Sequence, residues 1–421
     1  MKRHLLALAG ACGVLLTAGT GVAAAQSVQG VDQYAATGQS ASSNASSTQT
    51  NPSNSNISVR IFSPGDAGKV TQSNTSAAGA VAANEAETTQ AVDQSQSGGG
   101  GAAEQAVGQQ ALTGQEANAN AESKQVNPSN SNISVRIHSP GDDGDVTQSN
   151  TSKAGAIAHN DAETTQAVEQ EQGGGKDMGK DKDHCDCSGA GVQAVGQKAV
   201  TLQDADADAK SEQYHPSNSN TSVRIKSPGD NGSVSQSNDS IAKAIANNDA
   251  KTIQAVDQDQ AGGGCKCGGD RVQAVGQKAF TGQEADADAT SIQKGAKNSN
   301  VPVRIFSPGD DGDVEQSNTS AAFSGAFNDA KTLQLVDQDQ GGGGCKCDRH
   351  AMVQAVGQWA ETGQEADSDA TSKQEYPSNE NAPLRIKSWG DGGKVRQDNT
   401  SLAFALSLNR AFTLQAVEQE Q

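Results

Sequence analysis

The chain has 421 residues, of which 3% are aromatic and 33% hydrophobic, and its formal net charge at pH 7 is −19. So few large apolar side chains cannot build several conventional hydrophobic cores. A polyanion of this size also excludes DNA and acidic lipid surfaces as partners, because like charges repel. Order in such a chain must come from repetition, since a stacked array needs only contacts between neighbouring units.

Residues 1–25 have the pattern of a cleaved signal peptide. Lys2 and Arg3 precede an apolar run that reaches Leu16, and three alanines lie just before Gln26. The run is too short to span a bilayer as a helix, so it is typical of an export signal. We therefore expect a secreted or cell-surface protein whose mature chain has no transmembrane segment.

The rest of the chain contains five similar two-part units, joined by Gly-rich links. Each unit consists of a first repeated segment, a connector and a second repeated segment. The units span residues 27–96, 104–172, 192–260, 272–340 and 353–421.

The first segment of each unit alternates strictly between two kinds of residue. In its cleanest copy, Gln273 to Gln293, the odd positions are Gln, Ala, Val, Thr or Ser, and the acidic residues lie at even positions. A period of two predicts a β-strand with one packed face. Its packed glutamines include Gln277, Gln283 and Gln293.

The connector carries a short strand and a turn. Val223-Arg224-Ile225 is typical of a strand, and Pro228-Gly229-Asp230 is typical of a turn. The arginine recurs in every unit, so a stack would bring like charges together unless each met an acid. We expect the turn aspartate of the same unit to be that acid, which pairs Arg60 with Asp66, Arg136 with Asp142, Arg224 with Asp230, Arg304 with Asp310 and Arg385 with Asp391.

The second segment, Val234 to Gln260 in the third unit, has the most strictly repeated positions. Its even positions barely vary among the five units, whereas the position of Lys243 is Gly79 in one unit and Phe404 in another. Steps of two residues turn about 200° in a helix, so these positions would scatter around a helical cylinder. The fixed positions include Gln236, Asn238, Ser240, Asn248, Ala250, Thr252, Gln254, Gln258 and Gln260.

Fixed amides on a packed face need partners, because a buried unpaired amide costs about 1–3 kcal/mol. Identical strands stacked about 4.8 Å apart supply them, since each amide can donate to one neighbouring copy and accept from the other. The sequence therefore predicts ladders of stacked Gln and Asn side chains. A single strand of 27 residues would reach roughly 90 Å, so we also expect bends near Ala242–Asn248 and at Thr281–Gly282.

Three of the links contain a Cys-x-Cys pair, and successive pairs are 80 residues apart. In a secreted protein disulfides are the expected use. A four-thiolate metal site and free thiols are the alternatives. The six residues are Cys185, Cys187, Cys265, Cys267, Cys345 and Cys347.

The last unit carries large apolar side chains where its siblings carry small or charged ones. Such a surface is expected to be covered, either by self-association, by an anchoring surface protein or by the chain itself. The six residues are Leu402, Phe404, Leu406, Leu408, Phe412 and Leu414.

Nothing in the sequence favours catalysis. The histidines do not share a repeat position, and no nucleophile elbow, phosphate-binding loop or zinc-protease motif is present. We predict no catalytic residue, no cofactor and no specific metal site.

One short motif resembles a known family. Asn248, Ala250 and Gln254 form the pattern N-x-A-x-x-x-Q, which recurs in all five units and is similar to the later half of a curlin repeat. Curlins are secreted bacterial subunits whose strand-turn-strand repeats stack into functional amyloid fibres. The resemblance implies the same kind of array here, although the Cys-x-Cys links and the connector have no counterpart in curlins.

These patterns together predict an all-β repeat protein, either a β-solenoid or a curlin-like stack of strand-turn-strand units, behind a cleaved signal peptide. The predicted function is that of a secreted structural subunit of a fibre, matrix or surface layer. Two alternatives are a surface adhesin or cation-binding module that uses the acidic outer face, and a disordered surface polymer.

Overall fold

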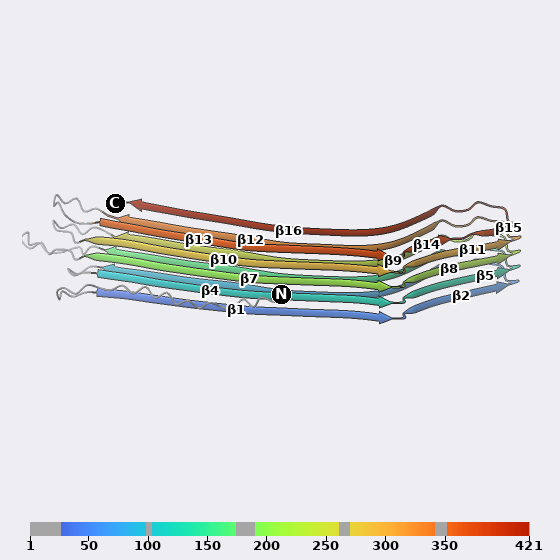
Figure 1. The fold of residues 1–421 in the computed structure, drawn as a ribbon, viewed down its shortest axis with the longest axis horizontal. Helices are drawn as coiled ribbons and strands as arrows, with labels where there is room; N and C mark the ends of the chain where they lie inside the picture. The colour runs from blue at the N-terminus through green and yellow to red at the C-terminus, as the bar shows by residue number, and fades with distance from the viewer. Residues whose placement is uncertain (1–26, 98–102, 174–189, 261–269, 342–351, 421) are drawn as a thin grey trace, which may run out of the picture.

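The computed structural model describes residues 27–97, 103–173, 190–260, 270–341 and 352–420. All regular structure in these residues is β-strand, and the strands stack as five rungs of a flat β-solenoid (Figure 1). The predicted all-β stacked fold is therefore confirmed. The whole stack forms within one chain, a point that the sequence left open.

Each rung contains a long outbound strand, a short strand, a turn and a long return strand. The outbound strands form one five-stranded sheet: β1 (Ser27–Thr50), β4 (Ala103–Val126), β7 (Gly191–Tyr214), β10 (Arg271–Lys294) and β13 (Met352–Glu375). The return strands form another: β3 (Val70–Ser97), β6 (Val146–Gly173), β9 (Val234–Gln260), β12 (Val314–Gln340) and β16 (Val395–Glu420). The short strands form the third: β2 (Ser53–Ile61), β5 (Ser129–Ile137), β8 (Ser217–Ile225), β11 (Lys297–Ile305), β14 (Ser378–Asn381) and β15 (Leu384–Ile386). We call these the outbound, return and short sheets.

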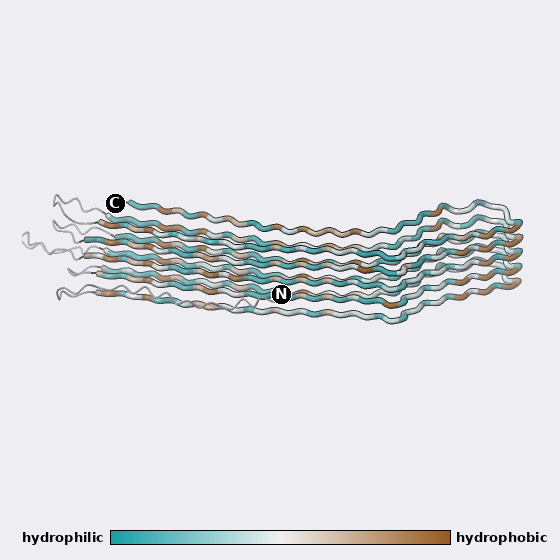
Figure 2. The backbone as a smooth tube through the Cα atoms, viewed as in Figure 1, coloured by the Kyte–Doolittle hydropathy of each residue, from teal (hydrophilic) through white to brown (hydrophobic). Residues whose placement is uncertain are grey.

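Neighbouring rungs pair in parallel with equivalent residues directly over one another. Gln277 of β10, for example, pairs with Gln197 of β7 on one side and Gln358 of β13 on the other. The spacing between equivalent residues varies from 76 to 88 along the chain, and the links absorb the difference. Figure 2 shows the result, because hydropathy alternates along each strand and matches from rung to rung.

The outbound and return sheets face each other and enclose a core of small and polar side chains. Ala205, Ala244 and Ala285 have no exposed surface, and Gln193, Gln254 and Asn248 have none either. Alanine lets the two sheets approach closely along the middle of the rungs, and a row of valines fills the core nearer the links. The alternating residues that the sequence assigned to a packed face are the ones that lie inside.

Side-chain amides in this core form continuous ladders. Gln254 Nε2 donates to Gln166 Oε1 at 2.8 Å, and Gln334 Nε2 donates to Gln254 Oε1 at 2.7 Å. Gln254 Nε2 also donates across the core to the backbone oxygen of Lys278 at 3.2 Å. Each amide therefore ties together two neighbouring rungs and the two facing sheets.

The bends expected near Ala242–Asn248 and at Thr281–Gly282 are wrong. Both places lie inside uninterrupted strands of 27 and 24 residues. The chain instead bends between the outbound and short strands, where His215 has a φ of 49°, and turns at Gly229, where φ is 129°. Side-chain ladders hold sheets flat against their usual twist, so the length limit of ordinary twisted strands does not apply.

Replacing Gln254 with leucine tests the ladders. The change removes two amide–amide bonds and leaves the Gln166 oxygen without its ladder donor. We expect the free energy of unfolding to fall by about 2–5 kcal/mol, measured by denaturant titration. Asp257→Leu, on the exposed face of the same strand, is the control and should cost less than about 0.5 kcal/mol. Equal effects of the two changes would show that the ladder amides do not stabilise the fold.

Candidate functional site: the ends and outer faces of the stack

The two ends of the stack are open sheet edges. Among the described strands, β1 pairs only with β4, and β16 pairs only with β12. The two facing sheets are offset by half a rung, since β3 contacts both β1 and β4, and β13 contacts both β12 and β16. As a result β1 projects at one end of the stack and β16 projects at the other.

The ladders have a direction, so the two ends differ chemically. Glutamine side chains donate toward the first rung, as Gln109 does to Gln33 at 3.0 Å. Inward-facing asparagine side chains donate toward the last rung, as Asn56 does to Asn132 at 2.7 Å. The first-rung end therefore presents ladder donors from Gln and acceptors from Asn, and the last-rung end presents the reverse. The two ends are complementary to each other and neither is complementary to itself.

The predicted partners of the connector arginines are wrong. Arg136 and Arg224 both pair with Asp143, through Nε–O distances of 2.6 and 3.3 Å, and not with Asp142 or Asp230. The side chain one residue later in the turn is the one that points inward toward the arginines. Asp142 and Asp230 supply backbone oxygens to the guanidinium groups instead.

The inward turn position is an aspartate in two rungs and varies in the others. Asp311 pairs with Arg304 and Arg385, both at 2.8 Å, and Asn231 accepts a hydrogen bond from Arg224 at 2.9 Å. One carboxylate thus serves two stacked arginines. Burial raises the pKa of Asp143, but the guanidinium groups of Arg224 and Arg136 outweigh that effect and hold it below its usual value.

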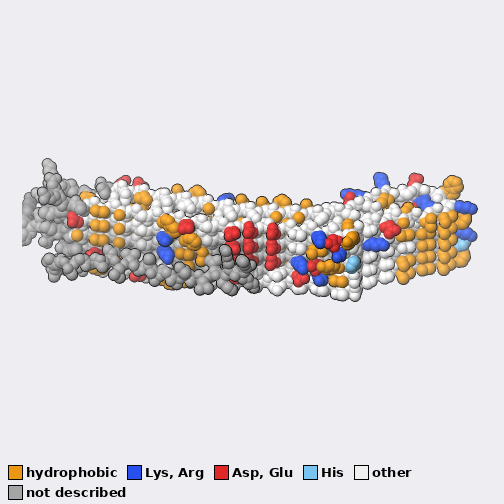
Figure 3. All heavy atoms as spheres, in the orientation of Figure 1, with side chains coloured by type: hydrophobic (Ala, Val, Ile, Leu, Met, Phe, Trp, Pro, Cys, Tyr) orange, Lys and Arg blue, Asp and Glu red, His pale blue; other side chains and the backbone are white. Residues whose placement is uncertain are grey.

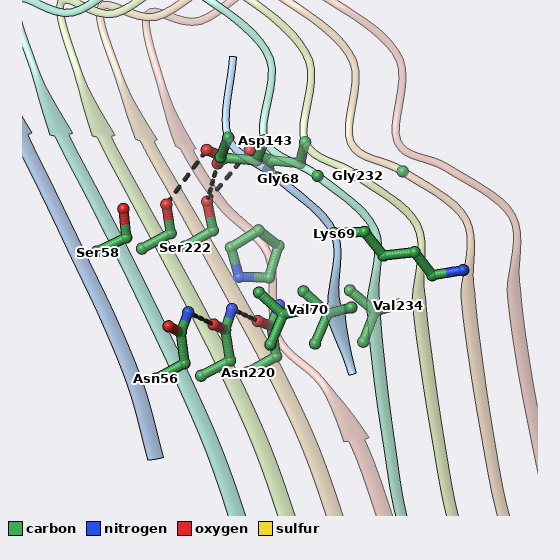
Figure 4. A pocket seen from close by; sticks show the side chains of 18 of the residues that line it. Asn56, Ser58, Gly68, Lys69, Val70, Asp143, Asn220, Ser222, Gly232 and Val234 are labelled. Carbon is green, nitrogen blue, oxygen red and sulfur yellow. Dashed lines mark hydrogen bonds between the residues drawn. The ribbon is translucent and has the colours of Figure 1, made fainter. Parts of the chain in front are cut away.

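A polar cavity of about 270 Å³ lies beside this arginine column, between the short strands and the start of the return strands. Figure 4 shows Ser222 pointing at Asp143, and their Oγ–Oδ2 distance is 2.9 Å. Asn220 accepts a hydrogen bond from Asn132 at 2.7 Å and continues a second row along the wall. These side chains satisfy one another, so the cavity is part of the ladder system.

Three columns of carboxylates run along the exposed face of the outbound sheet, where Figure 3 shows them as red rows. Burial and the neighbouring carboxylates, Asp206 first among them, raise the pKa of Asp204 to about 7. The same causes raise the pKa of Asp286 to about 6. Stacking like charges about 4.8 Å apart is unfavourable, and the described residues contain no group of three or more side chains that could hold a metal ion.

The six apolar residues of the last unit lie on the outer face of β16, where 45–58% of each side chain is exposed. Phe323, Phe327 and Leu333 of β12 lie beside them in the sheet register. This surface faces sideways, not along the stacking direction. It is therefore separate from the open ends.

A second apolar surface, on the outer face of the short sheet, was not expected from the sequence. Its signal was the alternation of Ile and Val in connector segments such as Ile57 to Ile61, in which only the arginine was given a role. The predicted signal peptide and the six cysteines lie outside the described residues. The described part of the chain also contains no helix long and apolar enough to cross a membrane.

Comparisons with known proteins found no relative. No family model matches the chain, and neither the curated proteins nor the solved structures contain a match. The surfaces described above therefore have to be interpreted from their own chemistry.

The two aspartates of the turn allow a matched test of the arginine column. Asp143→Ala removes the carboxylate shared by two buried arginines, and breaking such a pair costs about 3–5 kcal/mol. Asp142→Ala removes one exposed hydrogen bond to the Asp230 backbone, worth about 1 kcal/mol. Denaturant titration of both variants should reproduce this order. The opposite order would restore Asp142 as the ionic partner.

The carboxylate columns make stability depend on pH. Their folded-state pKa values are raised, so the folded protein holds more protons than the unfolded chain between about pH 4 and 7. The melting temperature should therefore rise as the pH is lowered from 8 to 5. Replacing Asp204, Asp206 and Asp208 with asparagine should flatten this dependence, and an unchanged slope would contradict it.

Proposed function

We propose that this protein is a secreted structural subunit that stacks end to end into an extracellular fibre, matrix or surface layer. The observation that carries the proposal is the match between the first and last rungs. Every ladder residue of the last rung has an equivalent in the first rung, 325 positions earlier. Gln354 corresponds to Gln29, and Asn379 corresponds to Asn54. A second copy can thus continue the ladders without a break.

The half-rung offset supports the same arrangement. In an end-to-end stack, β16 of one copy would pair with β3 of the next, and β13 would pair with β1. The projecting β16 of one copy would lie beside β3 of the next copy, and the projecting β1 of that copy would lie beside β13 of the first. Such an interface joins two different surfaces and does not close on itself, so it generates an open filament. Exposed sheet edges are prone to this kind of pairing unless charge or shape prevents it.

The outer face at the junction favours head-to-tail contact. The last rung carries Glu365, Asp367 and Asp369 in the three carboxylate columns, whereas the first rung carries Ser40, Ser42 and Asn44. Joining the last rung to the first places acids beside neutral side chains. Joining two last rungs would place acids against acids.

Three further side chains of the last rung gain partners at such a junction. Arg410 pairs with Asp329 at 2.8 Å within the chain, and it would also meet Glu85 of the next copy. Trp359, whose ring lies 4.3 Å from Lys278 Nζ, would meet Tyr34.

The third is Lys387, which lies 5.4 Å from the Phe306 ring and would meet Phe62. Cation–π and aromatic contacts of these kinds are favourable. The column that contains Arg410 is acidic in the other four rungs, so its single cation lies at the end where a junction would use it.

The outward apolar face of β16 has a different role in this proposal. It would recur once per subunit on the side of the fibre, where it could contact an anchoring surface protein or another fibre. The predicted export signal supports a location of this fibre outside the cell. The N-x-A-x-x-x-Q motif, which resembles curlins, supports the same assignment.

The carboxylate columns favour a second candidate, a soluble module that binds cations along its acidic face. Their raised pKa values show that the columns would gain from a positive counter-charge. A monomer that binds Ca²⁺ saturably, and that never forms fibres with a 4.8 Å repeat, would support this candidate over the structural one.

Charge exchange at the junction tests the fibre proposal. Arg410→Glu should place like charges at residues 410 and 85 and raise the critical concentration for assembly several-fold, as should Glu85→Arg. The double exchange should lower it again, because opposite charges meet once more. Sedimentation of fibres and electron microscopy measure the effect. If the double variant is no better than either single one, these residues do not meet.

A further inference from the structure

The outer face of the short sheet carries three columns of mostly β-branched apolar side chains. Figure 3 shows ordered apolar rows at the end of the molecule opposite the links. In register, the first column is Ile57, Ile133, Thr221, Val301 and Ala382, the second is Val59, Val135, Val223, Val303 and Leu384, and the third is Ile61, Ile137, Ile225, Ile305 and Ile386. This surface runs through all five rungs, unlike the apolar face of β16.

The face is almost free of charge in a strongly acidic chain. Lys297 and Glu380 are the only charged residues that face outward from the described short strands, and they lie 3.9 Å from each other. The connector arginines point inward, and those of the three inner rungs, Arg136, Arg224 and Arg304, are buried. Charge depletion together with regular apolar columns is typical of a surface that another sheet covers.

A second copy of the same surface fits it. A two-fold axis parallel to the stacking direction, through the middle column, places Val59 against Val59 and Ile57 against Ile61 of the partner. The same match recurs at every rung, with Ile133 against Ile137 and Val301 against Ile305. Side chains of two such flat sheets can interdigitate as they do in dry sheet-to-sheet interfaces.

This arrangement keeps two stacks pointing in the same direction. Both copies present their first rungs at the same end, so the contact repeats each time a subunit is added. The strands of the two copies run in opposite directions across the axis. The outbound sheets and their carboxylate columns therefore extend away from each other, and like charges do not meet.

We propose that the short sheets pair two stacks of this chain face to face into a double filament. This proposal depends on the fibre proposed above. Each copy offers an area of about 24 by 20 Å, on the order of 500 Å². A stable interface buries roughly 800 Å² per partner, so one pair of free subunits associates weakly. A filament adds the same area with every subunit, and pairing strengthens as the stacks grow.

The test places alternating charges in the middle column. The variant Val135→Glu, Val223→Lys, Val303→Glu puts opposite charges beside each other within a stack, where they attract. Across the two-fold axis it puts like charges against each other. We expect filaments with an unchanged 4.8 Å repeat whose mass per length, measured by dark-field electron microscopy, is half that of the wild type.

The matched control is Ala167→Glu, Ala255→Lys, Leu335→Glu, one register column on the outer face of the return sheet. It carries the same charges and should keep the wild-type mass per length. A wild-type mass per length of one chain per subunit rise would overturn the pairing and leave the fibre intact. A short-sheet variant whose filaments keep the doubled mass per length would do the same. A wild-type protein that forms no filament would overturn the proposed function and the pairing with it.

Discussion

The structure depends on one constraint, which is that each buried polar side chain must lie directly over its own equivalent in the next rung. An amide donates one hydrogen bond and accepts another along the ladder, so an unbroken ladder needs the same residue at the same place in both neighbouring rungs. Gln254 meets this condition between Gln166 and Gln334. The same rule explains how a chain with 3% aromatic residues can fold, because ladders and closely packed alanines replace a conventional apolar core.

Each inner rung finds the hydrogen-bond partners of its ladder residues in the rungs on both sides. The first and last rungs have a neighbour on one side only, so their ladders are incomplete. In the proposed fibre, association of copies would use the same interactions as folding of the chain, since a second copy offers the ladder partners that a sixth rung would offer. The differences between the end rungs are consistent with this view. The first rung is neutral where the last is acidic, and Arg410 ends a column that is otherwise acidic.

Charge is managed differently inside and outside the stack. Inside, one carboxylate such as Asp143 lies between two arginines and offsets their mutual repulsion. Outside, the carboxylate columns of the outbound sheet remain stacked and have raised pKa values. The outer face of the short sheet carries almost no charge, since Lys297 and Glu380 are the only charged residues that face outward from its described strands. These three solutions give each face of the molecule a distinct chemistry.

The sequence by itself determined the period of two, the identity of the packed face and the stacking of equivalent residues, because five internal copies show which positions cannot vary. It did not determine where the chain bends, since the length of Val234 to Gln260 suggested an interruption and only the ladders show why none is needed. It also did not distinguish Asp142 from Asp143, because the direction of a side chain in a turn depends on the backbone. The offset between the sheets, the two unlike ends and the joining of the connector Ile and Val residues into one surface were decided by the tertiary structure. They arise from how rungs lie on one another in space, and no single repeat contains that information.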